Sequence, residues 1–328
     1  MSVGASSELI AESEATVDSV DLVPGDVTAR SPLALFWRRF RADRVALVSA
    51  GFIILLILVA VLAPVVTSIL GLPGPNVNDS NALDAFGSPT GPSAAHPFGV
   101  DQLGRDVLSR IIYGSRVSLE VGIFGTMLAG VVGTVMGLLA GFYRGWMDTV
   151  ISRLIDVFLA FPVLVLGLGI GAACGVRGCA GGLIQPGLGT VIFIITLSSF
   201  TYIARIVRGQ VLSLREKEFV EAARSLGASN RRILFRELLP NMLAPLIVYS
   251  SLLIPTNVLF EAALSYLGVG IRPPTSSWGQ MISDAAPNSS TEWWYMLFPG
   301  VALLLTVLAF NLVGDGLLDA LNPRGESR

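Results

Sequence analysis

Lysine and histidine are almost absent from this 328-residue chain: Lys217 is the only lysine and His96 the only histidine. The phosphate-binding loop GxxxxGK[ST] needs a lysine after its second glycine. Lys217 lies in "REKEF", so the chain cannot hold that loop, and we expect no ATPase site and no cofactor in it. One histidine leaves no set of ligands for a histidine-based metal site, and we assign no metal.

Charged residues are also scarce. They make up 14% of the chain, against about 25% in ordinary soluble domains, while hydrophobic residues make up 52% and the mean hydropathy is +0.69. Several apolar runs approach the roughly 20 residues that cross a bilayer. The composition therefore predicts an all-α, polytopic membrane protein. The net charge of −2 gives no electrostatic reason to expect a nucleic-acid partner.

Six apolar segments are long enough to be transmembrane helices. We expect them near residues 45–66, 117–142, 149–173, 189–212, 241–264 and 294–318. The third and fifth contain proline, which spanning helices tolerate and use for kinks. The second contains Gly133, Gly137 and Gly141 on one stripe, which predicts close packing against another helix.

These spans divide the chain into regions. The first span is expected to be peripheral to a core of five helices. Residues 1–30 form a polar, acidic tail that is predicted to be disordered. Residues 31–66 contain an interfacial helix, rich in arginine and aromatic residues, and the first span. An outer loop follows at 67–116, then the core at 117–318, which includes a polar loop at 213–240, and a tail at 319–328.

Basic residues predict the orientation, because arginine and lysine gather on the cytoplasmic side of membrane proteins. With the first tail inside, 17 of the 22 basic residues lie on inner segments. The outer segments hold the other five, which are Arg105, Arg110, Arg116, Arg177 and Arg272. We therefore expect both termini and the polar loop in the cytoplasm.

This orientation places the two cysteines, Cys174 and Cys179, outside the cell membrane, where a disulfide can persist. Their spacing does not fit a CxxC motif. A bridge would close a six-residue ring in the loop between the third and fourth spans. The sequence leaves open whether the pair forms this disulfide or two free, buried thiols.

The outer loop has a charge pattern of its own. Asp101 and Arg105 are four residues apart, as are Asp106 and Arg110, so each pair can form an ion pair on a short helix. His96, a lone histidine in a loop, is expected to be a surface or turn residue.

The polar loop between the fourth and fifth spans contains "EFVEAARSLGASNRRILFRELLPN" from position 218. Phe219, Ala222, Ala223 and Leu226 recur at helical spacing and predict one apolar face of a short helix. By periodicity alone, this could be an interfacial helix without a partner.

A turn and a second helix are expected to follow. Gly227 stands where a helix end favours a left-handed residue. Ser229 can cap a second helix that runs through Leu239. Pro240 then interrupts the chain or restarts it at the next span. The whole stretch therefore predicts a helix, a glycine turn and another helix.

The residues of this stretch resemble the EAA loop of ABC-importer permease subunits. That loop has EAA, a glycine four residues after the last alanine, and Leu-Pro near its end. The matching residues here are Glu221, Ala222, Ala223, Gly227, Leu239 and Pro240. In that family the loop is the coupling helix that docks into a groove on a cytoplasmic ATPase, so the resemblance implies ATPase coupling for these six residues.

Other segments resemble the C-type permease subunit of dipeptide and oligopeptide ABC importers, from about residue 31 to 324. They include "HPFGVDQLGRDVLSRIIYGSRVSLEVG" at 96–122, "EAALSYLGVGIRPPTSSWGQMI" at 261–282 and "DGLLDALNPR" at 315–324. The resemblance implies a subunit of the bacterial cytoplasmic membrane that forms half of a translocation pathway and is not an enzyme.

The same resemblance implies the partners. They are a second permease subunit, two ATPase subunits that bind ATP and Mg²⁺, an extracytoplasmic peptide-binding protein and the lipid bilayer. Peptide is the expected cargo, although nickel and glutathione importers share this permease pattern. A secondary transporter driven by protons or sodium is less favoured. Such carriers place ionisable residues near the bilayer midplane, where this chain has Asn257 and hydroxyl groups.

Overall fold

A computed structural model describes residues 32–321, and over that range the regular elements are helices, with no strands beyond isolated β-bridges. The predicted all-α class is therefore confirmed. The acidic tail predicted at 1–30 and most of the tail predicted at 319–328 lie outside the described residues.

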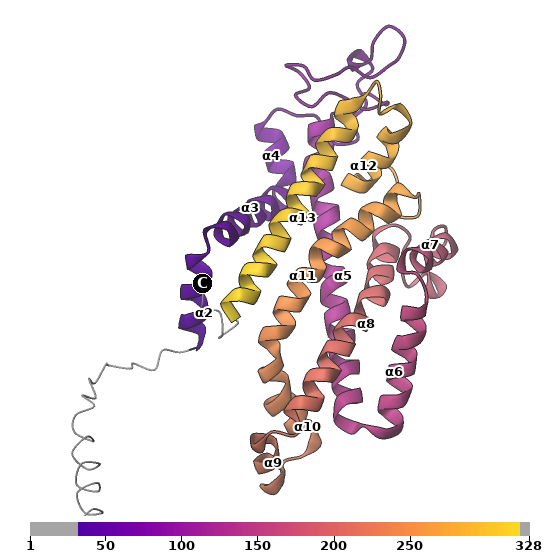
Figure 1. The fold of residues 1–328 in the computed structure, drawn as a ribbon. Coiled ribbons are helices and arrows are strands. Elements are labelled where there is room, and N and C mark those ends of the chain that lie inside the picture. The colour runs from indigo at the N-terminus through magenta and orange to yellow at the C-terminus, as the bar shows by residue number, and fades with distance from the viewer. Residues whose placement is uncertain (1–31, 322–328) are drawn as a thin grey trace, which may run out of the picture.

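The helices follow one another along the chain as a bundle with short elements at both ends (Figure 1). They are α2 Pro32–Ala42, α3 Arg44–Val61, α4 Ala63–Ile69, η1 Ser80–Ala82, α5 Val107–Tyr143, α6 Gly145–Ala160, α7 Val163–Cys174, η2 Ala180–Gly182, α8 Leu188–Leu214, α9 Glu218–Ser225, α10 Asn230–Arg232, the π-helix η3 Ile233–Leu238, α11 Leu239–Tyr266, α12 Trp278–Ala285, η4 Ala286–Asn288 and α13 Trp293–Leu321.

Five helices in the described range are long and apolar enough to cross a membrane singly: α3, α5, α8, the continuous helix Asn230–Tyr266, and α13. They confirm five of the predicted spans. The segment predicted as one span at 149–173 is instead a pair of helices, α6 and α7, bent by 88°. Proline has no amide hydrogen and disfavours the helical conformation of the residue before it. Phe161, just before Pro162, is accordingly extended (φ −87°, ψ 134°).

Helix α5 forms the middle of the bundle and packs along α8 on one side and against α11 on the other. The glycine stripe of α5 allows the close contact with α8. A Cβ atom on Gly133 would lie 2.7 Å from the carbonyl oxygen of Phe200, and one on Gly137 would lie 2.6 Å from that of Ala204. The predicted packing face is therefore confirmed.

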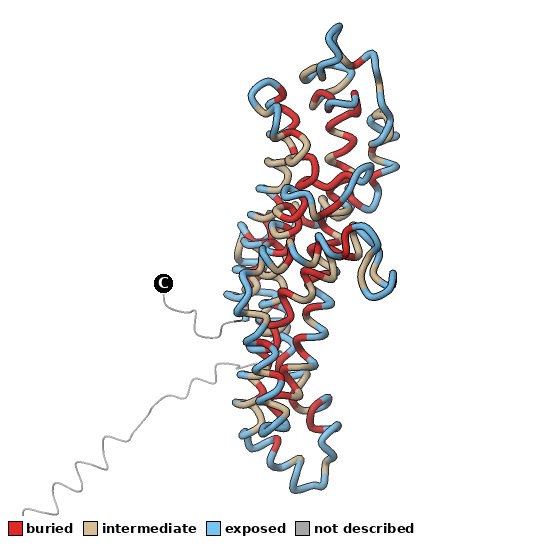
Figure 2. The backbone as a smooth tube through the Cα atoms, turned by 90° about the vertical axis from the view of Figure 1, so that its right-hand side faces the viewer, coloured by how far each residue is buried: buried red, intermediate tan, exposed pale blue. Residues whose placement is uncertain are grey.

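Buried residues run along the bundle axis, and exposed residues lie on its outer surface and at its two ends (Figure 2). The first span, α3, packs against α13 and α5 at one edge of the bundle (Figure 1). Only 22% of its residues are buried, compared with 61% of the apolar window in α8.

Neutral polar side chains tie the central helices together. The Ser199 hydroxyl donates to the Asn257 carbonyl oxygen at 2.8 Å, and the Asn257 amide donates to the Thr126 hydroxyl at 2.8 Å. All three residues are buried, and they come from α8, α11 and α5. Such hydrogen bonds fix how the helices are rotated against one another.

A buried carboxyl lies farther along α11. Glu261 is fully buried and accepts hydrogen bonds from the Ser118 hydroxyl of α5 (3.1 Å) and the Ser265 hydroxyl (2.7 Å). The Ser118 hydroxyl also accepts from the Trp278 amide at 3.4 Å. Glu261 therefore joins α5 and α11 to the start of α12.

Candidate functional site

The polar loop ends in an exposed projection beyond α6 and α8, at the bottom of Figure 1. We call residues 218–229, which comprise α9 and the turn after it, the knob. Glu221 and Ala222 are exposed on it, and Leu226 at its tip is 88% exposed.

The apolar face of α9 differs from the one predicted. Val220 is fully buried and Ala223 is partly buried, and both pack against the core, whereas Phe219 is 38% exposed and Ala222 is exposed. Periodicity was a poor guide because α9 has only eight residues. Contacts at its two ends, and not its own apolar stripe, decide how so short a helix is rotated.

The tip of the knob is a hydrogen-bonded turn around Gly227, which has φ +77°. The Gly227 amide donates to the Arg224 carbonyl at 2.9 Å, and the Ala228 amide donates to the Ala223 carbonyl at 3.0 Å. This pair of bonds is a Schellman motif, which satisfies the last carbonyls of α9. The predicted left-handed glycine is therefore confirmed.

The second half of the loop is continuous with the next span. Ser229 caps α10 by accepting from the Arg232 amide at 3.4 Å, as predicted. Pro240 was predicted to interrupt the chain or to restart it at the next span. The second alternative fits, because Pro240 lies in the first turn of α11, although the helical course is continuous from Asn230 to Tyr266. The π-helix η3 permits this, because the Leu239 amide bonds to Leu234, five residues back. The wider turn accommodates a proline that lacks an amide hydrogen.

Three arginines fasten the loop to the end of α5. The Arg144 guanidinium donates to Glu216 at 2.6 Å, and the Arg215 guanidinium donates to the Phe142 carbonyl at 2.7 Å. Arg224 on α9 lies over the Phe142 ring, 5.9 Å from its centre. Desolvation lowers the pKa of Arg215, and the positive charges of Arg144 and Arg224 lower it further. These contacts join the loop and α9 to the end of α5.

An apolar groove of about 560 Å³ starts beside the loop and runs between α5 and α11. Leu239 and Phe235 lie at its loop end, and Thr126 and Ile254 also line it. The six residues of the EAA pattern are thus split. Glu221, Ala222 and Gly227 are exposed on the knob, Ala223 faces the core, Leu239 lines the groove, and Pro240 is exposed near the groove.

The opposite end of the bundle carries residues 70–106, which we call the lobe (top of Figure 1). Asp101 is 1% exposed. Its carboxylate accepts from the Arg105 guanidinium at 2.6 Å and lies 3.5 Å from that of Arg110, which is fully buried. The pair Asp101–Arg105 is confirmed, although it lies in a turn rather than on a helix.

The second predicted pair of the lobe, Asp106 with Arg110, is wrong. Asp106 precedes α5 and caps it, accepting from the Ser109 amide at 2.7 Å, while its other oxygen lies 2.9 Å from His96 Nδ1. A helix cap directs the carboxylate toward the amides of the first turn and away from a side chain four residues on. Within residues 32–321, no group of three His, Cys, Asp or Glu side chains could hold a metal ion.

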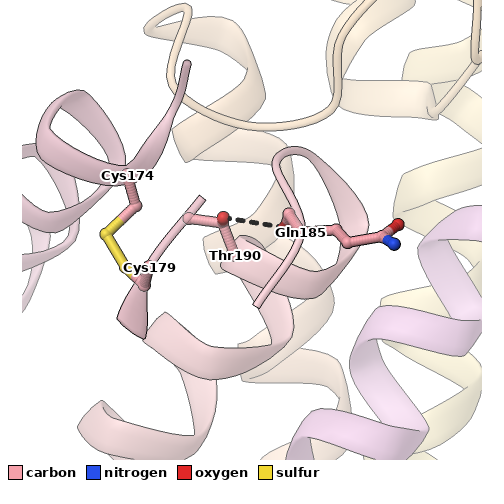
Figure 3. The surroundings of a disulfide bond; sticks show 4 residues. All are labelled: Cys174, Cys179, Gln185 and Thr190. Carbon is pink, nitrogen blue, oxygen red and sulfur yellow. Dashed lines mark hydrogen bonds between the residues drawn. A yellow bond between two sulfur atoms is a disulfide. The ribbon is translucent and has the colours of Figure 1, made fainter. Parts of the chain in front are cut away.

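The two cysteines are bonded to each other in the structure, with their Cα atoms 4.9 Å apart (Figure 3). The Cys179 amide donates to the Ile184 carbonyl at 2.9 Å, and the Ile184 amide donates back at 3.2 Å. The Thr190 hydroxyl donates to the Gln185 carbonyl at 3.0 Å. The ring thus stands between the end of α7 and the start of α8, beside further hydrogen bonds that order this loop.

Sequence reasoning missed the residues that hold the knob in place. Val220, Ile233 and Leu238 are fully buried in one cluster, and Arg215 binds the end of α5. Ile233 and Leu238 are five residues apart, a spacing that fits a π-turn and not an α-helix. That spacing could have indicated Ile233 and Leu238, whereas no local pattern indicates Val220 or Arg215.

Comparison with known families gives two matches. The model of the binding-protein-dependent transport system inner membrane component matches residues 133–326. The model of the N-terminal TM domain of oligopeptide transport permease C matches residues 31–82. Together they cover the first span, the bundle from the last third of α5 onward, and the knob.

Relatives of similar length are also found. The dipeptide transport system permease protein DppC of Alkalihalophilus pseudofirmus is 41% identical over 92% of this chain and 92% of that protein. The glutathione transport system permease protein GsiD of Pectobacterium atrosepticum is 39% identical over 92% of this chain and 94% of that protein. GsiD of Escherichia coli O6:H1 is 40% identical over 95% and 96%, respectively.

The fold itself has a solved counterpart. A chain of the inward-facing MetNI methionine ABC transporter aligns with a TM-score of 0.53, covering 66% of this chain and 97% of that one at 20% identity. This likeness concerns the fold alone. On the family models and the relatives, the chain belongs to the inner membrane components of binding-protein-dependent transport systems, and within them to the permeases of the oligopeptide C type.

Proposed function

We propose that this permease forms half of the pathway of an ATP-driven importer of dipeptides or short oligopeptides. A second permease subunit would complete the pathway, and an extracytoplasmic binding protein would deliver the peptide. Two ATPase subunits would bind inside, one of them on the knob, and would hold the ATP and Mg²⁺. The groove between α5 and α11 is then the wall that faces the pathway and the second permease.

The observation that carries this proposal is the construction of the knob. Its tip is exposed and apolar at Leu226, its turn is closed by hydrogen bonds around Gly227, and Arg215 and Arg144 bind its base to α5. A rigid projection joined to the central helix can transmit movement. The ATPase must bind the knob with different affinities in the inward-facing and outward-facing states of the permease. Without that difference, ATP binding drives no motion.

The orientation that this function requires is supported by charge. The knob end carries Arg144, Arg215, Lys217, Arg224 and Arg231, among other basic residues. We propose, on the positive-inside rule, that this end and both termini are cytoplasmic and that the lobe and the disulfide are outside.

The proposed cargo rests on the relatives. One whose name specifies dipeptides and others whose names specify glutathione match this chain over more than nine tenths of its length, at 39–41% identity. Glutathione is itself a tripeptide, so both cargoes are short peptides. Glutathione is therefore the second candidate, and nickel is the third.

Two substitutions test the coupling role of the knob. Ala222→Glu and Leu226→Asp change exposed side chains and should leave expression unchanged, while the ATPase subunits no longer co-purify and peptide uptake falls at least ten-fold. Val176→Asp is the matched control, because Val176 is a 77%-exposed aliphatic residue at the other end of the core. Normal uptake and co-purification in both knob variants would refute the coupling role.

Uptake assays test the cargo. Cells that lack this gene would be given a labelled tripeptide, labelled glutathione or radioactive nickel in parallel. Loss of tripeptide uptake that the intact gene restores would support the proposal. Loss of glutathione or nickel uptake alone would overturn the cargo and leave the permease architecture unchanged.

A further inference from the structure

The short helix α2 and the first residue of α3 present an exposed basic surface beside the membrane span. Arg38, Arg41 and Arg44 are all exposed, and Trp37 is 52% exposed. The Arg41 guanidinium lies over the Trp37 ring, 5.7 Å from its centre. Because Arg38 and Arg41 are three residues apart on one helix, their side chains are neighbours.

This surface is held rigidly against the bundle. Phe40, on the other side of α2, is 7% exposed and packs with Ala46 of α3 and Ala320 of α13. Asp43 caps α3 by accepting from the Val45 and Ala46 amides at 2.9 and 3.0 Å. The cap fixes the angle between the two helices and therefore the place of Arg44 relative to α2.

The three arginines have no acidic partner within the described residues. The salt bridges found there involve other arginines, such as Arg144, Arg205 and Arg208. Asp43 accepts the cap bonds through Oδ1 and makes no ion pair with Arg38, Arg41 or Arg44. Asp315 and Asp319, at the end of the neighbouring helix α13, are exposed and make no ion pair with Arg38, Arg41 or Arg44. Three positive charges therefore remain available to an external anion.

The place of the charges indicates which anion. Arg44 is the first residue of α3, and the next turn exposes Val45 (57%) and Val48 (74%), which suit a hydrocarbon environment. Tryptophan and arginine at such a boundary lie at the level of lipid headgroups. A protein partner with an acidic surface would not explain why the apolar exposure begins immediately beside the charges.

We propose that Arg38, Arg41 and Arg44 form a binding site for the headgroup phosphate of an anionic phospholipid, with Trp37 at the glycerol level. The site rests on the cytoplasmic orientation of α2 proposed above, and so it takes lipid from the inner leaflet.

Lipid binding to the assembled transporter tests this site. The full-length chain, purified with its partner subunits, would be titrated with phosphatidylglycerol, phosphatidylethanolamine or inorganic phosphate, and bound lipid would be counted by native mass spectrometry. Phosphatidylglycerol should bind in preference to phosphatidylethanolamine. In Arg38→Gln/Arg41→Gln/Arg44→Gln its affinity should fall by about a hundred-fold, or about five-fold for each arginine.

Two further variants make the result decisive. The variant Arg38→Lys/Arg41→Lys/Arg44→Lys keeps the three positive charges, which also favour the cytoplasmic placement of this end. It should therefore fold and retain most of the lipid even if the glutamine variant does not fold. Arg177→Gln removes one exposed charge from the loop between α7 and α8 and should change nothing. Unchanged phosphatidylglycerol binding in the glutamine variant, equal binding of phosphatidylethanolamine, or displacement of lipid by inorganic phosphate would overturn the proposal. Since no nucleotide or peptide is present, it can fail while the transport function stands.

Discussion

The lobe and the knob, at opposite ends of one bundle, use charged side chains in opposite ways. In the lobe, Asp101 is 1% exposed and its charge is balanced within the chain by Arg105 and Arg110. In the knob, Glu221 is exposed and makes no salt bridge within the described residues, and the tip is an exposed leucine.

The difference teaches how each end is stabilised. The lobe depends on its own buried ion pairs, so removing one partner leaves an uncompensated charge. The knob depends on its base, where Val220 is buried and Arg215 binds carbonyl groups, while its tip contributes little to the chain's own stability. We therefore expect substitutions of the lobe's buried charges to alter stability, and substitutions of the exposed side chains at the knob tip to alter function.

The largest effect on stability is expected from Asp101→Ala. It leaves two buried guanidinium groups without their carboxylate, which should cost about 3–5 kcal/mol locally. Amide hydrogen exchange at residues 99–110 would measure this loss as reduced protection. Glu120→Ala is the control, because its pair with Arg116 is exposed and should contribute about 0–1 kcal/mol. Unchanged protection in Asp101→Ala would contradict this account of the lobe.

A smaller effect is expected from the paired substitution Cys174→Ser/Cys179→Ser. Closing a six-residue ring should stabilise the loop by about 2 kcal/mol in the chain-entropy model. Intact-mass measurement without reductant should first show a deficit of two hydrogens in the wild-type chain. Full alkylation of both thiols without reductant would show that the bridge does not form in cells.

Gly227→Ala should cost about 1–2 kcal/mol, because the alanine must adopt a left-handed conformation at φ +77°. Faster hydrogen exchange at α9 would report it. Gly209→Ala is a control that should change stability in the opposite direction. Gly209 lies inside α8, and a Cβ atom added there would have open space around it. That change should stabilise the helix by about 0.5–1 kcal/mol. Equal effects at the two glycines would show that the turn does not need glycine.

The smallest effect on stability is expected from Leu226→Ala, within about 0.5 kcal/mol because the side chain is exposed. Val220→Ala in the same helix should cost about 2 kcal/mol, because it removes buried methyl groups. Thermal unfolding of the purified chain should show the larger loss of stability in Val220→Ala. Relative to its loss of stability, Leu226→Ala should lose more peptide uptake than Val220→Ala does. A large thermal shift in Leu226→Ala would show that the tip is structural.

Local patterns predicted several elements correctly. Apolar runs located five spans, although α5 begins at Val107 and not near residue 117. The glycine stripe predicted the α5–α8 contact, and Gly227 and Ser229 predicted the turn and the cap. The predictions that failed depended on neighbours outside the segment. They concerned the rotation of α9 and the partner of Asp106.

By itself, the sequence determined the membrane class, five of the six predicted spans and the residues that match the EAA pattern. Length, apolar content and left-handed glycines act over one helix or one turn, so they can be read from consecutive residues. Only the tertiary structure decided that Val220 is buried while Leu226 is exposed, and that the chain bends by 88° between α6 and α7. The physical reason is that burial and ion pairing are shared between segments far apart in the chain, as between Arg215 and Phe142, and no local pattern specifies that partner.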